Sequence, residues 1–254
     1  MIFFIFSQFF LAESLFFNKQ YDLAVIEYKR LFFFDSSSQQ DSRLRLHYTI
    51  TLLKKDFLSG YEEIERLLND FPELNTESRL LLTKELIDAG NYTLALDILK
   101  PIEDDTLKKK LLGFGYLFNH QYYNALNEFK TTDNNLAMEI EKYIKRPERS
   151  LTRAMLFSAL VPGAGEVYAG DFKRGIQDFV LSFLSGFFVF KAIKNKEYVD
   201  AGIVFSFAFN RFYFGSISNA AGIVQKKTEK SEKEWLDYIK EKYYKEAIEE
   251  IIKY

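Results

Sequence analysis

The chain has 254 residues, a formal net charge of −2, no cysteine and an aromatic content of 17%. Without cysteine it can form neither a disulfide framework nor a thiolate metal site, and a net charge near zero gives no electrostatic reason to expect a nucleic-acid partner. Hydrophobic residues make up 48% of the chain, which is enough for a packed core, and the length allows one large domain or two ordinary ones.

The N-terminus, "MIFFIFSQFFLAESLFF", begins with an apolar run that no Lys or Arg precedes. A secretory signal normally carries such a basic residue before an apolar stretch of about 7–15 residues. The run Ile2–Phe6 is short, and Ser7 offers a small residue where cleavage could fall. Residues 1–8 are therefore predicted to be the remnant of a signal peptide. The alternative is that Phe3 to Phe10 is buried in the first helix.

A pattern of aromatic, small and apolar residues recurs through the first half of the chain. In "NKQYDLAVIEYKRLFFFDSS", the residues Tyr21, Ala24, Tyr28 and Leu31 share one face of a helix, because residues three or four apart are neighbours on a helix surface. The small Ala24 then falls where two helices touch. Three later segments repeat the pattern, with Phe57, Gly60, Ile64 and Leu67, with Tyr92, Ala95, Leu99 and Ile102, and with Tyr122, Ala125 and Phe129.

The small residues Ala24, Gly60, Ala95 and Ala125 recur close to the period of about 34 residues that is typical of tetratricopeptide repeats. The segment Leu112, Gly113 and Tyr116 adds the pattern of a first helix to the last copy. Residues 9–147 therefore resemble an array of about four tetratricopeptide helix pairs.

This resemblance implies a curved solenoid whose concave face holds a peptide or a partner protein. Exposed positions on the first helix of each pair would make the contacts. The candidate partner-binding residues are Lys84, Asp88, Lys110 and Phe114. The alternative for each of them is ordinary solvated surface.

The composition changes after a basic run from Lys142 to Arg153 that Pro147 interrupts. From Ala154 to Val224 charges are sparse, and the segments Gly175–Ile193 and Ala201–Val224 approach the roughly 20 residues that cross a bilayer. Small residues in both segments permit close packing of membrane helices. Residues 150–225 are therefore predicted to form a helical membrane domain, and a soluble helical bundle is the alternative.

The segment Ser158–Ile176, "SALVPGAGEVYAGDFKRGI", holds four glycines and a proline. A P-loop would end in Lys followed by Ser or Thr, and a dinucleotide-binding loop would follow a strand of a βαβ unit. Neither context is present, so a phosphate site is not indicated. Pro162 and Gly163 are predicted to break an apolar helix, and the later glycines allow tight turns within a membrane.

The same segment resembles the PGxGQxYxGxxxxG signature of small bacterial membrane domains that often follow a tetratricopeptide region, and more loosely the helical hairpin of TM2-type domains. The matching residues are Pro162, Gly163, Gly165, Tyr168, Gly170 and Gly175. Glu166 stands where Gln is usual and places an ionisable group at the bend. The resemblance covers about residues 150–224 and implies a membrane architecture without a biochemical role.

Three ionisable residues fall within or beside the apolar segments, namely Glu166, Asp178 and Arg211. A charge inside a membrane span costs a few kcal/mol and usually faces a partner or a cavity. A helical hairpin could bring Arg211 toward Glu166 or Asp178 as a structural pair. The alternative is a path for protons or ions.

The tail, residues 229–254, is predicted to be a separate amphipathic helix, because apolar residues recur on one stripe. These residues are Trp235, Ile239, Tyr243, Ala247 and Ile251. Ser231 and Glu234 have the spacing of a capping box at a helix start. The helix could lie on the membrane surface, dock on the repeats, or pair with another copy of the chain in a homo-oligomer.

Nothing in the sequence indicates an enzyme. The two histidines, His47 and His120, lie in the repeat segments and are interpreted as structural. No nucleophile motif, metal-ligand spacing or phosphate loop stands out, so neither a cofactor nor a metal is expected. The predicted protein is all-α and non-enzymatic, a scaffold of the bacterial inner membrane whose repeats bind a protein partner. The alternative function is a small channel or transporter subunit that uses Glu166, Asp178 and Arg211.

Two features of the sequence bear on the orientation in the membrane. A cleaved signal would place the repeats in the periplasm, and three crossings would return the tail to the cytoplasm. The basic runs before residue 154 and after residue 225 both favour the cytoplasm, which fits two crossings and a re-entrant first segment. The periplasmic orientation of the repeats is the one expected.

Overall fold

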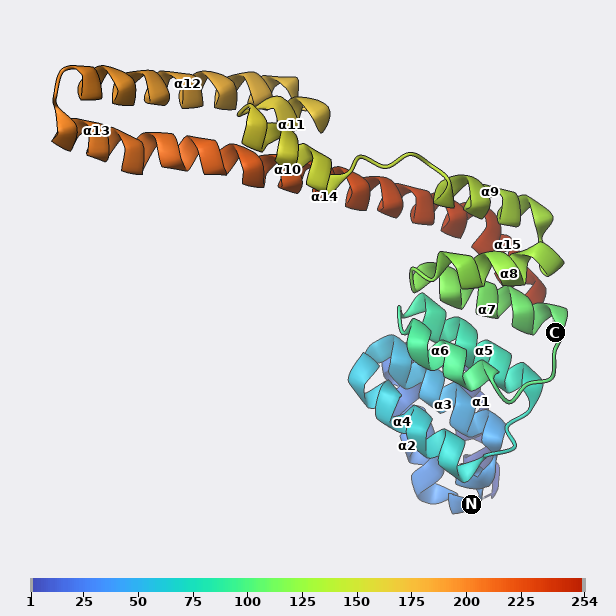
Figure 1. Cartoon of the computed structure of the whole chain (residues 1–254). Coiled ribbons are helices and arrows are strands. Elements are labelled where there is room, and N and C mark those ends of the chain that lie inside the picture. The colour runs from blue at the N-terminus through green and yellow to red at the C-terminus, as the bar shows by residue number, and fades with distance from the viewer. Residues whose placement is uncertain (1, 253–254) are drawn as a thin grey trace. The chain divides into compact units, whose positions relative to one another are not determined.

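The computed structural model describes the backbone of residues 2–252 and the side chains of residues 7–249, and all regular structure within these ranges is helical (Figure 1). The predicted all-α class is therefore confirmed. The chain divides into two compact units. Unit 1 comprises Met1–Ile144 together with Lys240–Tyr254, and unit 2 comprises Lys145–Ile239.

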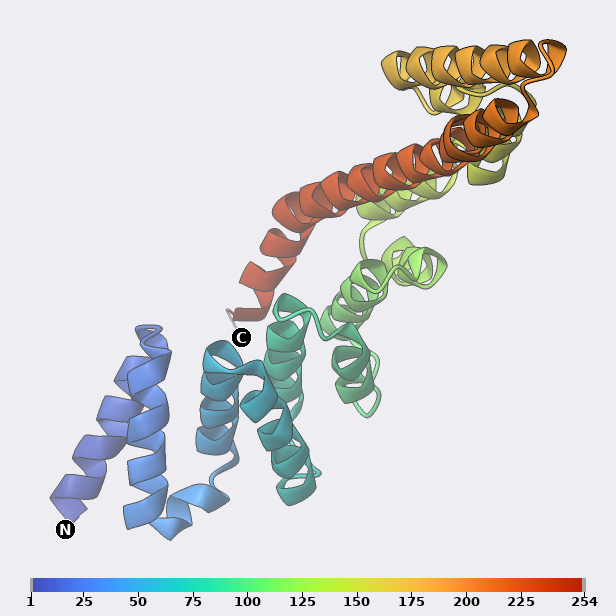
Figure 2. The same cartoon turned by 90° about the vertical axis from the view of Figure 1, so that its left-hand side faces the viewer.

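Most helices of unit 1 follow one another as hairpins (Figure 1). The pairs are α1 (Ile2–Phe17) with α2 (Tyr21–Phe34), α3 (Ser42–Lys55) with α4 (Phe57–Asp70), α5 (Thr76–Asp88) with α6 (Tyr92–Leu99), and α7 (Thr106–Phe118) with α8 (Tyr122–Thr132). A 3-10 turn, η1 (Ser36–Gln40), precedes α3, and α9 (Asn134–Ile144) packs on α8. The first helices α1, α3, α5 and α7 contact one another in that order and so share one face of the stack (Figure 2).

Side-chain caps define where several of these helices begin. The Asp41 carboxylate accepts hydrogen bonds from the backbone N–H groups of Arg43 and Leu44 at the start of α3. Asp56 and Asn75 do the same for α4 and α5. Each cap satisfies a backbone donor that the first turn of a helix leaves without a partner.

The small residues of the repeated pattern are buried between helices, as predicted. Ala24, Ala95 and Ala125 are each 0% exposed. Gly60 of α4 lies so close to α3 that a Cβ there would be 2.6 Å from the Leu53 Cα. The hairpins can therefore close only because these positions lack bulk.

The C-terminal segment returns to unit 1 as a π turn, η3 (Lys240–Tyr244), followed by α15 (Lys245–Ile252). The sequence placed Ile239, Tyr243 and Ala247 on one apolar stripe, and Ile239 and Ala247 are buried, at 0% and 7% exposure. Between them Tyr244 is buried, at 2% exposure, while Tyr243 is half-buried. A π turn holds one residue more than an α turn, which moves the inward position from Tyr243 to Tyr244.

Unit 2 is built from a long helical hairpin and a short one. The long hairpin consists of α12 (Phe172–Lys194) and an opposite arm formed by α13 (Tyr198–Val204), the π turn η2 (Phe205–Phe209) and α14 (Asn210–Ile239). The short hairpin consists of α10 (Leu151–Leu160) and α11 (Ala164–Tyr168), and it packs on α14 (Figure 1). A small core of Ala154, Ala169, Ala220, Ile223 and Val224 holds the two together.

The start of a separate tail helix at Ser231 is contradicted, because α14 runs without a break from Asn210 to Ile239. No Gly or Pro follows Gly222 in this stretch, so nothing in the local chemistry ends the helix. The Ser231 hydroxyl accepts a hydrogen bond from Arg146 Nη1 at 2.9 Å and caps nothing.

The expected signal segment rests on side chains that are mostly outside the described part of the structure. The backbone of Ile2–Phe6 is the first part of α1. Ala12, further along the same helix, is fully buried against Tyr28 and its neighbours in unit 1. A cleaved signal over residues 1–8 stays a prediction.

Candidate functional site

A groove with a volume of about 590 Å³ lies on unit 1. All four first helices and the residue before α5 contribute to it. Its lining residues are Phe16, Phe17, Ser42, Arg43, Leu46, His47, Asn75, Glu77, Ser78, Leu80, Leu81, Lys84, Glu85 and Leu107. Six of these residues are apolar or aromatic and eight are polar or charged, and binding sites in proteins combine apolar walls with polar groups that orient a ligand.

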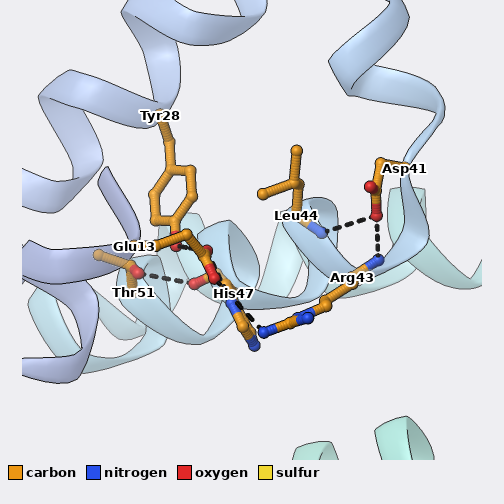
Figure 3. Close-up of polar contacts among 7 residues, drawn as sticks. All are labelled: Glu13, Tyr28, Asp41, Arg43, Leu44, His47 and Thr51. Carbon is orange, nitrogen blue, oxygen red and sulfur yellow. Dashed lines mark hydrogen bonds and ion pairs between the residues drawn. The ribbon is translucent and has the colours of Figure 1, made fainter. Parts of the chain in front are cut away.

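A buried carboxylate, Glu13, contacts two residues of the groove lining, Arg43 and His47 (Figure 3). Its Oε1 accepts a hydrogen bond from the Tyr28 hydroxyl at 2.6 Å and lies 2.8 Å from His47 Nδ1. Because an ionised carboxylate can only accept, Nδ1 of His47 carries the proton. The Nη2 atom of Arg43 lies 3.8 Å from the other oxygen of Glu13. One carboxylate thereby connects α1, α2 and α3.

The surroundings of Glu13 favour its charged form. Burial raises the pKa of this carboxyl, but the hydrogen bonds from His47 and Tyr28 and the charges of His47 and Arg43 outweigh it and hold the pKa below its usual range. Burial and the bond to Glu13 raise the pKa of the Tyr28 hydroxyl. Tyr28 therefore stays a neutral donor and Glu13 an ionised acceptor near neutral pH.

His47 is held by stacking as well as by its hydrogen bond. The Phe16 ring stacks on the imidazole with centroids 4.4 Å apart, and Phe17 meets it edge-on at 5.8 Å. Within the described residues Nε2 makes no hydrogen bond, and His47 lines the groove. This nitrogen can accept a hydrogen bond from a ligand when the ring is neutral and donate one when it is charged.

The sequence did not indicate that Glu13 and His47 would meet, since they are 34 residues apart in the chain. His47 was interpreted as structural, which its buried contacts support, but its place on the groove was not foreseen. One signal was available for Glu13, which is the only acidic residue in the apolar helix α1. A lone acid in an apolar helix is expected to have a buried partner.

The predicted partner-binding residues fall into two groups. Lys84 lines the groove, and its Nζ pairs with Glu85 at 2.7 Å and with Asp88 at 3.1 Å. Lys110 is half-buried on α7 and does not line the groove. Phe114 was expected at an exposed position but is only 2% exposed.

Tyr244 from the C-terminal segment covers Phe114. Its ring contacts Phe114 and Phe118 edge-on, with centroids 5.1 and 5.5 Å apart. Its hydroxyl donates to Asp88 Oδ1 at 3.0 Å, and burial together with the charge of Asp88 raises its pKa. Three of the four predicted residues, Lys84, Asp88 and Phe114, thus surround the chain's own tyrosine.

In unit 2 the glycine motif forms a buried hydrogen-bond network around Glu166, which is 0% exposed. Glu166 Oε2 accepts from the hydroxyls of Ser158 at 2.7 Å and Ser216 at 3.2 Å. These hydroxyls in turn accept from the backbone N–H groups of Gly165 and Gly163. This network therefore joins the turn between α10 and α11 to α14.

Glycine is required at two of the predicted motif positions for different reasons. Gly163 has φ 90°, and a Cβ there would clash with the Gly175 carbonyl. Gly170 has φ 82° at the end of α11. Both backbones lie in the left-handed region that side chains avoid. The Tyr168 hydroxyl accepts a hydrogen bond from the Ser150 N–H at 3.1 Å, and Pro162 lies in the turn between α10 and α11.

The structure does not bring Arg211 to the two acidic residues. Arg211 is exposed and, among the described residues, has no ion pair. Asp178 is half-buried and accepts from the Asn219 side chain at 3.1 Å. The expected pair fails because Asn219, two turns further along α14, is the residue that reaches α12.

Metal binding has no visible basis in the described residues, where no group of three or more His, Asp or Glu side chains is close enough to hold an ion. The chain was also compared with protein-family models, with curated proteins and with solved structures, and none of the three comparisons gave a match.

Proposed function

We propose that this chain is a non-enzymatic adaptor anchored in the bacterial inner membrane. Unit 1 binds an extended peptide segment of a partner protein, and unit 2 is the anchor. The observation that carries this proposal is the groove, because it opens on the one face that all four first helices share.

A tetratricopeptide-type solenoid is the arrangement we propose for unit 1. The consecutive helix pairs and the buried small residues, such as Ala24 and Gly60, support it. In such stacks each pair contacts only its neighbours, which leaves a continuous inner surface for a ligand. The first-helix groove is the part of that surface that remains open beside the docked tail.

The part of the groove around Arg43 favours a ligand that carries an acidic group beside an apolar one. Its apolar wall includes Phe17 and Leu81, which can pack on side chains of an extended peptide. Arg43 lies at the rim with its side chain 70% exposed, so its guanidinium can bind a carboxylate. Such a site discriminates by combining a few polar contacts with apolar burial.

Membrane anchoring by unit 2 is supported by α12. Among the described residues it is the only helix that is long and apolar enough to cross a bilayer, and only 17% of its most apolar window is buried. A core helix of a soluble protein would be mostly buried. Large side chains such as Phe183, Phe190 and Phe207 are instead 64%, 67% and 76% exposed, and so extensive an apolar surface marks a membrane or protein contact.

The opposite arm of the hairpin would form the second crossing. The segment 198–224 runs through α13, η2 and the first half of α14, and its 27 residues extend roughly 40 Å at 1.5 Å per residue. This exceeds the bilayer core of about 30 Å. The π turn η2 divides the arm into pieces, which is why no single helix of it is long and apolar enough by itself.

A peptide-binding experiment tests the proposal for unit 1. A display library of short random peptides is selected on the full chain in detergent, and the affinities of the selected peptides are then measured by calorimetry. Arg43→Ala should weaken binding about fivefold, which corresponds to roughly 1 kcal/mol for a partly exposed charge contact. The control is Arg66→Ala on α4, whose side chain is 67% exposed. Equal effects of the two variants, or selected peptides that tolerate Arg43→Ala, would place binding elsewhere.

Transport is the weaker candidate. Glu166 is fully buried, and its carboxylate accepts from the hydroxyls of Ser158 and Ser216, so it lacks the contact with water that an ion path needs. Arg211 is not joined to it. We therefore assign Glu166 the role of fixing the turn between α10 and α11 against α14.

A further inference from the structure

Basic residues from three separate stretches of unit 2 gather at one end of its helices. The stretches are Lys145–Arg153, Asp171–Arg174 and Lys226–Lys233, and together they are called the basic collar. Arg149 and Lys227 both donate to the carbonyl oxygen of Ala169, and Arg146 donates to Ser231. These contacts hold the first and last stretches beside the end of α11, directly before the second stretch.

The charge of the collar differs from that of the opposite end of the hairpin. The collar holds ten Lys and Arg residues and four Asp and Glu residues, whereas the turn Lys191–Asp200 holds three lysines and two acids. Membrane orientation follows the count of Lys and Arg near the ends of the spans, with little contribution from Asp and Glu. The collar is thus the end that favours the cytoplasm.

The path of the chain makes the collar both its entrance and its exit. α10 leaves the collar and α11 returns to it, since Tyr168 and Ala169 contact Ser150 and Arg149. The 10 residues of α10 extend about 15 Å, half of the roughly 30 Å needed to cross. The long hairpin then leads away along α12 and back along α14, where Asn219 meets Asp178.

The chain therefore enters unit 2 at Lys145, where the first collar stretch begins, and leaves it at Ile239, shortly after the last collar stretch. Unit 1 includes residues on either side of unit 2 in the chain, because Lys240–Tyr254 belongs to the same compact unit as Met1–Ile144. A compact unit cannot be divided by a bilayer. The number of crossings must be even, which favours two crossings over three.

We propose that the basic collar is an interaction surface for the anionic phospholipid headgroups of the cytoplasmic leaflet, and that unit 1 consequently lies in the cytoplasm. This rests on the proposed anchoring of unit 2 in the membrane. The cytoplasmic leaflet carries a negative surface potential that attracts basic residues beside a span. The orientation is opposite to the periplasmic one that a cleaved signal would give.

Cysteine labelling of the full chain tests the orientation, since the chain has no cysteine of its own. Single cysteines replace the exposed residues Asn195, between α12 and α13, and Glu62, on α4. A membrane-impermeant maleimide is applied to intact bacterial spheroplasts and to lysed ones. We expect Asn195→Cys to react in intact spheroplasts and Glu62→Cys only after lysis.

The other outcomes separate the two proposals. Labelling at Glu62→Cys and not at Asn195→Cys in intact spheroplasts would overturn the orientation and leave the anchor standing. Labelling at both in intact spheroplasts would overturn the two crossings. Recovery of the chain in the soluble fraction would refute the anchor and the collar proposal together.

Charge reversal tests the role of the collar itself. Arg153, Lys173 and Lys226 are exposed, and within the described residues their side chains make no hydrogen bond or ion pair, so replacing all three with Glu should spare the fold. We expect a mixture of both orientations and a severalfold loss of anionic lipid retained in native mass spectra. The matched control reverses the lysines of the opposite turn, Lys191, Lys194 and Lys196. A single orientation with unchanged lipid retention in the collar variant would overturn the proposal.

Discussion

Replacing Tyr28 with phenylalanine should loosen the N-terminal three helices of unit 1 without changing their apolar packing. The substitution removes only the hydroxyl, which donates to the Glu13 carboxylate at 2.6 Å. Tyr28 is 0% exposed and Glu13 is 7% exposed, so water cannot replace the lost donor. A hydrogen bond to a charged group contributes about 1.5–3 kcal/mol. We expect a loss of about 2 kcal/mol.

Hydrogen exchange measured by mass spectrometry is the suitable assay, because it reports the free energy of local opening for each segment. A loss of about 2 kcal/mol corresponds to roughly thirtyfold faster exchange of the protected amides in α1, α2 and α3. The full chain in detergent is compared with Tyr28→Phe under the same conditions. Amides of α7 and α8 serve as an internal reference, because they lie outside the three affected helices.

Two further variants separate the loss of the hydrogen bond between Tyr28 and Glu13 from other effects of removing the Tyr28 hydroxyl. Tyr61→Phe removes a hydroxyl that makes no hydrogen bond among the described residues, and it should leave exchange within about twofold. In the background of Glu13→Gln the acceptor is neutral, so the loss caused by Tyr28→Phe should fall to about 1 kcal/mol. Equal effects of Tyr28→Phe with and without Glu13→Gln would refute the charged hydrogen bond.

Three further predictions concern Gly163, Tyr244 and Glu13. Gly163→Ala should lower the stability of unit 2 by at least about 3 kcal/mol, because the new Cβ would sit on a left-handed backbone and clash with the Gly175 carbonyl. The control Gly222→Ala, with open space around it, should instead raise the stability by about 1 kcal/mol. Denaturant titrations followed by tryptophan fluorescence measure both changes. Tyr244→Ala should release the C-terminal segment and speed its cleavage in limited proteolysis at least about tenfold, whereas Tyr244→Phe should fall between it and the wild type. The folded-state pKa of Glu13 is lowered from 4.5, so the contribution of its charge to stability is present above pH 4.5 and is lost as the pH falls through the folded-state pKa. Below about pH 4 the hydrogen exchange of α1–α3 should therefore accelerate more in the wild type than in Glu13→Gln. Parallel pH dependences of exchange in the two proteins would contradict this.

Much of the local structure follows from short-range patterns in the sequence. The helical class and the burial of Ala24, Gly60 and Ala95 depend on the spacing of residues within single helices, which the sequence displays directly. The glycines at positions 163 and 170 mark left-handed turns for the same reason, since few other residues adopt that backbone. These features were predictable because each is decided by neighbours along the chain.

The tertiary structure alone decided which distant residues meet. Glu13 and His47 come together because α1 and α3 pack side by side, and no local pattern in the chain specifies that contact. The π turn at Lys240–Tyr244 shifted the buried tyrosine by one residue, and the docked tail then covered Phe114. Arg211 stayed exposed while Asn219 reached Asp178. In each case packing between helices chose the partner, whereas the sequence by itself determined only the faces that the helices could offer.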